Sequence, residues 1–166
     1  QAYGIIRQLG EMKIKSVVID KESFNIAKYS KYCQSSYVIP YSSIFDFLMK
    51  FTKEGKYYKW LIIPTDDYYV RIVSQYYDEL SQYYNLLTDK WEKVSVFYNK
   101  CMTYPYVDKL GIPIPITIYP KSVEEVKNFG FQAKFPCIIK PAIMKDFYSI
   151  FGSKVLVCND YNDLIN

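Results

Sequence analysis

Short apolar segments alternate with amphipathic segments through the first half of this 166-residue chain. Runs rich in β-branched or other apolar residues predict buried strands at 16–20, 37–40 and 60–63. Between them, apolar residues recur at helical spacing, which predicts helices at about 2–12 and 43–53 and a third after residue 66. Alternating strands and helices with short connections form βαβ crossovers, so we expect an α/β fold with a parallel sheet covered on both faces.

The ends of these elements carry recognisable signals. Ser42 or Ser43 is expected to cap the second helix, and Thr65 or Asp66 the third. Gly10 lies near the end of the first helix, where glycine is a common stop residue. A helix that opens the chain also implies a strand before it, so we expect these residues to be part of a larger domain.

The second half follows a different order. Thr88 and Asp89 predict a helix to about Tyr98, and a second helix from about 100 to 110 is expected to end at Gly111. The run 112–120 predicts a strand interrupted by prolines, and 122–125 is a capping box that opens a helix to about 129. Strands at 135–140 and 155–158 and a helix from 161 complete an antiparallel α+β pattern. We therefore expect two domains, 1–90 and 91–166.

Composition excludes several classes of function. The 21 basic and 17 acidic residues give a net charge of only +4, and the lysines are interspersed with acids, so no nucleic-acid partner is expected despite 19 tyrosines. The four cysteines lack metal-ligand spacing and the chain has no histidine, which argues against zinc and against the usual catalytic triads. Free cysteines indicate a reducing cytoplasm. Neither a signal peptide nor an apolar run of about 20 residues, the length of a membrane span, is present.

The run from Phe135 to Ala142 carries one lysine, Lys140, at the end of an apolar strand between two prolines. Such a strand can present an ammonium group to a cleft, and phosphates are an obvious target. The alternative is a lysine at a strand end that simply extends into solvent.

Five segments in order resemble an ATP-grasp carboxylate–amine ligase of the carbamoyl-phosphate-synthase-like or D-aspartate-ligase-like type. They are Gly4–Gly10, Ile62–Asp67, Asn99–Lys100, Leu110–Thr117 and Phe135–Pro141. The resemblance implies a Rossmann-like pre-ATP-grasp domain followed by the first α+β subdomain of the ATP-grasp fold, truncated at both ends. It covers nearly the whole chain.

The resemblance implies that Lys100 and Lys140 hold the phosphates of ATP and that Ile138 lines the adenine pocket. Ile138 precedes Lys140 by two residues, so both should lie on one face of the strand. The alternatives are a solvated helix lysine for Lys100 and ordinary core for Ile138. The family usually has Asp before the first lysine, where this chain has Asn99.

The resemblance also places the acceptor substrate near Thr65, Asp66 and Asp67, although a helix cap alone would explain these residues. The ligands of Mg2+ are expected outside this chain. The phosphate loop of the superfamily corresponds to 144–154, which has one glycine and is either a flap over the triphosphate or a plain connection.

The function implied is ATP-dependent ligation of a carboxylate to an amine through an acyl phosphate, with small-molecule substrates, and the chain by itself is expected to be inactive. One alternative is a noncatalytic Rossmann-like module that binds a nucleotide or sugar nucleotide. Another is a structural or interaction domain. Tyrosine-rich helix faces could form an interface between subunits or could reflect composition alone, so the sequence does not decide whether the protein forms an oligomer.

Overall fold

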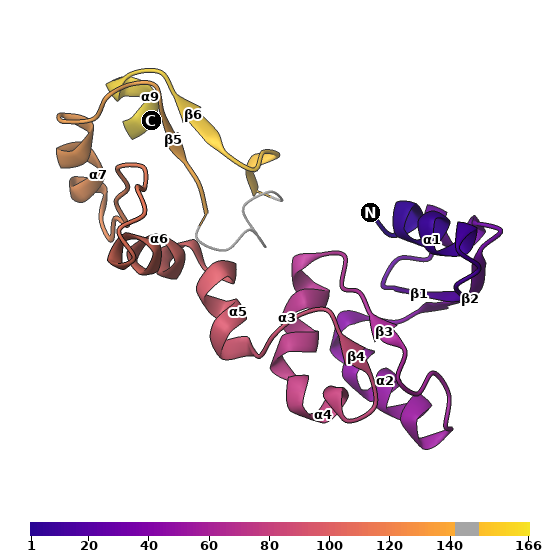
Figure 1. Ribbon diagram of the computed structural model, residues 1–166. Coiled ribbons are helices and arrows are strands. Elements are labelled where there is room, and N and C mark those ends of the chain that lie inside the picture. The colour runs from indigo at the N-terminus through magenta and orange to yellow at the C-terminus, as the bar shows by residue number, and fades with distance from the viewer. Residues whose placement is uncertain (142–149) are drawn as a thin grey trace. The chain divides into compact units, whose positions relative to one another are not determined.

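The computed structural model describes residues 1–141 and 150–166. The chain divides into two compact units, Gln1–Val94 (unit 1, indigo to magenta in Figure 1) and Ser95–Asn166 (unit 2, towards orange and yellow). Each unit is described on its own.

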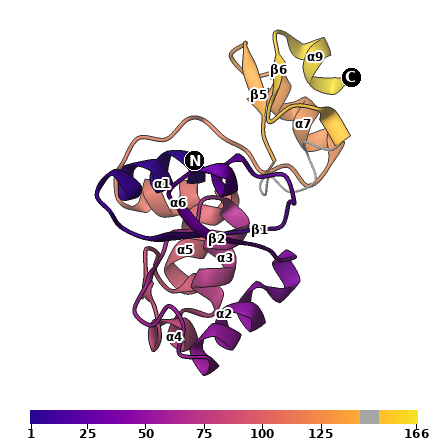
Figure 2. The ribbon, with the colours of Figure 1, turned by 90° about the vertical axis from the view of Figure 1, so that its right-hand side faces the viewer.

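Unit 1 opens with a helix and a pair of parallel strands. Its elements are α1 (Ala2–Glu11), β1 (Ser16–Asp20), a 3-10 turn at Ile26–Tyr29, and β2 (Cys33–Val38). Figure 2 shows β1 and β2 side by side, and their register places Val18 opposite Ser36. The prediction of α1 and β1 is confirmed. The predicted strand at 37–40 is wrong in its bounds, since β2 begins earlier, at Cys33. The early part of β2 is mostly polar and only half-buried, so a search for apolar runs does not detect it.

A second parallel pair completes unit 1. The elements are α2 (Ile44–Lys53), β3 (Leu61–Ile62), α3 (Asp67–Gln75), α4 (Tyr77–Ser81) and β4 (Asn85–Leu86), with β3 parallel to β4. The α/β class is confirmed, but the described strands form two parallel pairs rather than one sheet. Ser43 is the N-cap residue of α2, as one of the two predicted alternatives, but its side chain makes no capping hydrogen bond within the described residues, because a 3-10 turn at Tyr41–Ser43 leads into the helix.

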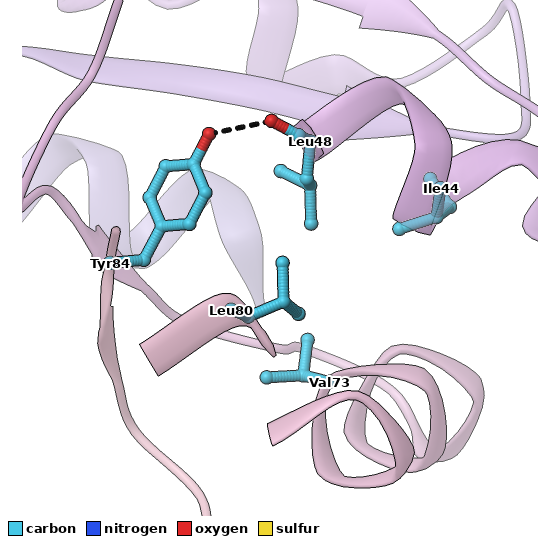
Figure 3. Close-up of a cluster of buried hydrophobic side chains, with 5 residues drawn as sticks. All are labelled: Ile44, Leu48, Val73, Leu80 and Tyr84. Atoms are coloured by element: carbon cyan, nitrogen blue, oxygen red, sulfur yellow. Dashed lines mark hydrogen bonds between the residues drawn. The ribbon is translucent and has the colours of Figure 1, made fainter. Parts of the chain in front are cut away.

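The main core of unit 1 lies between α2, α3 and α4. Figure 3 shows its buried members, which are Ile44, Leu48, Val73, Leu80 and Tyr84. The Tyr84 hydroxyl donates a hydrogen bond of 2.8 Å to the carbonyl oxygen of Leu48, and burial raises the pKa of Tyr84 to about 12. This bond satisfies a polar group in an otherwise apolar cluster, as a buried tyrosine requires.

A smaller core of Ile6, Val18 and Ala27 joins α1 to β1, and Tyr32 packs against it. Gly10 is not the stop residue that the sequence indicates, because α1 continues through it to Glu11. A Cβ atom at Gly10 would overlap the ring of Tyr32. Glycine is therefore required here for the close approach of Tyr32 to the helix.

Unit 2 contains the only antiparallel strand pair among the described residues. After α5 (Trp91–Tyr98), which spans the boundary between units, come α6 (Lys100–Lys109), α7 (Val123–Gly130), β5 (Cys137–Ile139), β6 (Leu156–Cys158) and α9 (Tyr161–Ile165). β5 and β6 pair with Ile138 opposite Val157, and α9 contacts α7 and β6. The predicted α+β pattern is thus present, and Gly111 adopts φ +71° just after α6, as expected of a helix-ending glycine.

The predicted strand at 112–120 is wrong: within this fully described range the chain forms no strand. Its prolines at 113, 115 and 120 remove the N–H groups that a ladder needs. The predicted cap by Ser122 is confirmed, whereas the return bond of Glu125 goes to the residue before the cap. The Ser122 hydroxyl accepts a 3.2 Å hydrogen bond from the Glu125 N–H, and the Glu125 carboxylate accepts one of 2.9 Å from the Lys121 N–H.

In the described parts of the chain, every helix is too short or too polar to cross a lipid bilayer.

Candidate functional site

Thr65, Asp66 and Asp67 follow β3 in unit 1, at the end of a parallel strand where open α/β sheets bind ligands. Asp66 caps α3: one carboxylate oxygen accepts a 2.9 Å hydrogen bond from the Tyr69 N–H, and the other accepts one of 3.1 Å from the Tyr41 hydroxyl. Both oxygens of Asp66 are therefore already engaged. The capping alternative explains Asp66 fully, and contact of these residues with a substrate stays a prediction.

A second acid, Asp20, ends β1. Its carboxylate accepts a 2.9 Å hydrogen bond from the Glu22 N–H and another from the side-chain amide of Asn25. Asp20 and Asp66 act electrostatically on the same tyrosine: burial, then the charge of Asp20 and then that of Asp66, raise the pKa of Tyr69 to about 12. The carboxyl ends of β1 and β3 thus bring two carboxylates to a shared ring.

Tyr41 joins this acidic edge. Its ring stacks on Tyr68 with centroids 4.3 Å apart, and the Lys21 ammonium lies 5.5 Å from its ring centroid. Burial, and after it the charge of Asp66, raise the pKa of Tyr41. The site prediction omitted Asp20, Tyr41 and Tyr69. An acid at the end of one predicted strand, Asp20, and another shortly after the end of a second, Asp66, are the signal that could have found this cluster.

Substitution of Asp66 by alanine is expected to lower the free energy of unfolding by about 1 kcal/mol, because the cap of α3 is lost. Asp66→Asn should cost less than about half of that, since asparagine caps as well as aspartate. Urea denaturation followed by tryptophan fluorescence measures both variants in unit 1, which holds Trp60 and Trp91. Equal losses in the two variants would show that the charge of Asp66, not its role as a cap, is what stabilises the fold.

Lys100 lies in unit 2 as the first residue of α6 and is half-buried. Asn99 caps this helix: its side chain accepts a 3.0 Å hydrogen bond from the Cys101 N–H. The Tyr119 hydroxyl donates a 3.1 Å bond to the carbonyl oxygen of Lys100 and so ties the segment after Gly111 back to the start of α6. The backbone at Lys100 is therefore held from two sides.

Lys140 follows β5 directly and is exposed. Along this strand Cys137 and Ile139 are half-buried, whereas Ile138 and Lys140 lie on the exposed side. Ile138 is 53% exposed and its partner Val157 is 56% exposed, so an apolar surface borders the lysine. The alternative interpretation of Ile138 is an ordinary core residue. Its exposure does not agree with that interpretation within unit 2.

The structure therefore places Lys100 and Lys140 in the same unit, one at a helix start and the other after a strand. A shared contact with a triphosphate stays a prediction. Residues 144–149 of the expected phosphate loop 144–154 lie outside the described residues, and Gly152 has φ +63°.

The described side chains form no cluster that would hold a metal ion by themselves. Residues 1–141 and 150–166 contain no group of three or more Asp, Glu, Cys or His residues that could hold a metal ion. Carboxylates are the protein ligands that Mg2+ prefers. No metal site is therefore assigned to residues 1–141 and 150–166.

Neither a family model nor a curated protein matches the sequence significantly. Solved structures do match. The biotin carboxylase domain of Hydrogenobacter thermophilus 2-oxoglutarate carboxylase, in complex with MgADP, ADP and bicarbonate, has a TM-score of 0.65 and 18% identity, over 99% of this chain and 36% of that chain. N5-carboxyaminoimidazole ribonucleotide synthetase from Thermotoga maritima has a TM-score of 0.60 and 16% identity, over 98% and 39%.

The biotin carboxylase subunit of pyruvate carboxylase is also similar, with a TM-score of 0.52 and 20% identity over 99% of this chain and 36% of that chain. This chain thus spans less than two fifths of the length of each of these structures. At 16–20% identity this chain shares the fold of these structures, as the resemblance predicts. Whether the similarity extends to carbamoyl-phosphate synthases stays a prediction.

Proposed function

We propose, from the fold that this chain shares with ATP-grasp carboxylate–amine ligases, that it forms one side of the ATP site of such a ligase. The observation that carries the proposal is the exposed surface of β5 and β6 in unit 2. There an ammonium group, Lys140, borders the apolar side chains of Ile138 and Val157. An apolar surface beside a cation suits a nucleotide, which has a flat base at one end and phosphates at the other.

Lys140 and Lys100 would hold the phosphates. A lysine ammonium is a compact charge with three donors, and it can follow the phosphoryl oxygens as charge shifts among them. Ile138 would contact the adenine. We assign Thr65, Asp66 and Asp67 to the acceptor side, with Thr65 the best candidate because both carboxylate oxygens of Asp66 already accept hydrogen bonds.

In the proposed reaction, a carboxylate oxygen attacks the γ-phosphorus of ATP and the bond to ADP breaks, which leaves an acyl phosphate and ADP. The amine nitrogen then attacks the acyl carbon, phosphate leaves, and the nitrogen loses a proton. The part of the protein in such a reaction is positioning and electrostatic stabilisation rather than covalent catalysis. Magnesium would be held by residues outside those that the structure describes.

The proposal is tested with a reagent in which an acyl group is attached to the terminal phosphate of ATP. When this reagent is bound, it transfers its acyl group to lysines that lie beside the phosphates. We expect acylation of Lys100 and Lys140, located by peptide mass spectrometry, and suppression of both by excess ATP. Lys134, an exposed lysine of the same unit, serves as the matched control and should react slowly and independently of ATP. Labelling of all three lysines to the same extent, unaffected by ATP, would contradict the assignment.

A further inference from the structure

Two cysteines face each other across the antiparallel strand pair of unit 2. The register of β5 and β6 places Cys137 directly opposite Cys158. Side chains of directly opposite residues lie on the same face of a sheet, with Cβ atoms about 4.5–5.5 Å apart. All four cysteines of the chain are free thiols, and the other two lie in other elements, Cys33 in β2 and Cys101 in α6. The strand pairing therefore brings two thiols together that the sequence keeps apart.

The spacing of these two positions suits a disulfide bond. Directly opposite residues of an antiparallel pair have Cα atoms about 4.5 or about 5.5 Å apart, depending on whether the two residues exchange backbone hydrogen bonds. Disulfide bonds join residues whose Cα atoms are about 4.4–6.8 Å apart. Both kinds of pair fall within this range. A bond between Cys137 and Cys158 therefore requires no large movement of either strand.

The two thiols differ in their access to solvent. Cys137 is half-buried, whereas Cys158 is only 2% exposed, and α9 contacts the strand that carries it. Burial, and after it the Cys137 thiol and the charge of Asp163, raise the pKa of the Cys158 thiol. A dissolved oxidant therefore reaches Cys137 first, and Cys158 is a protonated thiol held beside it.

We propose that Cys137 and Cys158 form a redox-sensitive dithiol, a modification site that hydrogen peroxide converts reversibly to a cross-strand disulfide. The Cys137 sulfur attacks one oxygen of the peroxide, the O–O bond breaks, and the other oxygen leaves as water, so that Cys137 becomes a sulfenic acid. The Cys158 sulfur then attacks the Cys137 sulfur, the S–O bond breaks, and a second water leaves with the proton of Cys158. The two thiols together lose two electrons, which reduce one peroxide to two waters.

The bond would hold the ends of a long loop together. Cys137 and Cys158 are 21 positions apart, and the chain between them includes Lys140. A cross-link of this kind restricts the unfolded chain and prevents β5 and β6 from separating. In a reducing compartment such bonds are transient and sense oxidants. The assignment rests on strand pairing and burial and is independent of the proposed ligase function.

The test is oxidation of the 166-residue protein by a small molar excess of hydrogen peroxide. We expect the number of thiols that react with DTNB in denaturant to fall from four to two, and to return to four after dithiothreitol. After remaining thiols are blocked with N-ethylmaleimide, peptic digestion at low pH and mass spectrometry should identify the peptide of Cys137 linked to that of Cys158. Amide hydrogen exchange in β5 and β6 should slow about tenfold in the oxidised protein.

Four single variants make the result specific. Cys33→Ser and Cys101→Ser are the matched controls, and each should still lose two thiols on oxidation. Cys137→Ser, a change at a half-buried position, should keep its three thiols over the same time. Cys158→Ala should leave Cys137 as a sulfenic acid that dimedone traps. If the alanine variant does not fold, Cys137→Ser still decides the question.

A thiol count that stays at four would overturn the proposal. So would a linkage of Cys137 to Cys33 or Cys101, or a linkage between two chains. Oxidation of Cys137 to a sulfinic acid while Cys158 stays reduced would also contradict it, because the neighbouring thiol would then have failed to react with the sulfenic acid.

Discussion

Substitution of Lys140 by alanine is expected to weaken ATP binding about 100-fold. A hydrogen bond that involves a charged group contributes about 1.5–3 kcal/mol. At about 1.4 kcal/mol per factor of ten, removal of the ammonium group corresponds to roughly 10- to 150-fold in the dissociation constant. Lys140 is exposed and follows β5 without being part of the core, so the fold of unit 2 should survive the change.

The measurement is isothermal titration calorimetry with MgATP on the full-length protein. Lys134→Ala is the control, because it removes an exposed lysine of the same unit from the segment that precedes β5. Lys140→Arg keeps the charge and should retain part of the affinity, although arginine presents a planar fork rather than a point charge. If Lys140→Ala binds ATP as tightly as Lys134→Ala does, Lys140 is a solvated lysine and not a phosphate ligand.

Substitution of Leu80 by alanine is expected to lower the free energy of unfolding of unit 1 by about 3 kcal/mol, within the range of 2–5 kcal/mol typical of buried leucines. Leu80 is 0% exposed and belongs to the cluster with Ile44, Leu48, Val73 and Tyr84 (Figure 3). The side chains around it come from α2, α3 and the segment before β4, so the packing cannot collapse easily around the vacated space.

Urea denaturation followed by tryptophan fluorescence reports on this loss, because Trp60 and Trp91 both lie in unit 1. Leu87→Ala is the matched control: Leu87 is 62% exposed, and its replacement should change the free energy of unfolding by less than about 0.5 kcal/mol. A similar loss in the two variants would show that the cluster around Leu80 is not the core of the unit.

Periodicity predicted the longer elements of the fold. α1, β1 and α2 follow from apolar residues at helical or strand spacing, because each of these elements buries one stripe of side chains. α4 and β4 were not predicted, since segments of five and two residues are too short to show a period. For the same reason Leu80 and Tyr84 were not recognised as core residues, although both are buried.

The segment 112–120 shows the opposite error. Its alternation of isoleucine and proline resembles a strand in composition, but a strand exists only where a neighbour supplies hydrogen bonds. Such pairing is a property of the tertiary structure, and no local pattern reports it.

For the candidate site, local sequence was sufficient to identify single positions. A lysine after an apolar strand and an acid after a parallel strand are positional signals, and the structure places Lys140 and Asp66 in those positions. The partners of these residues could not be predicted in the same way. Tyr41 reaches Asp66 over 25 positions of the sequence, and Asp20 influences Tyr69 over 49, through folding alone.

The sequence by itself determined the class of the fold, the capping of α3, α6 and α7 by Asp66, Asn99 and Ser122, and the position of Lys140 at a strand end. These features depend on residues within a few positions of one another. Only the tertiary structure decided that β1 and β3 line one cavity and that the charges of Asp20 and Asp66 both act on Tyr69. Those features arise from residues distant in the chain, whose proximity is set by packing and strand pairing across the whole unit.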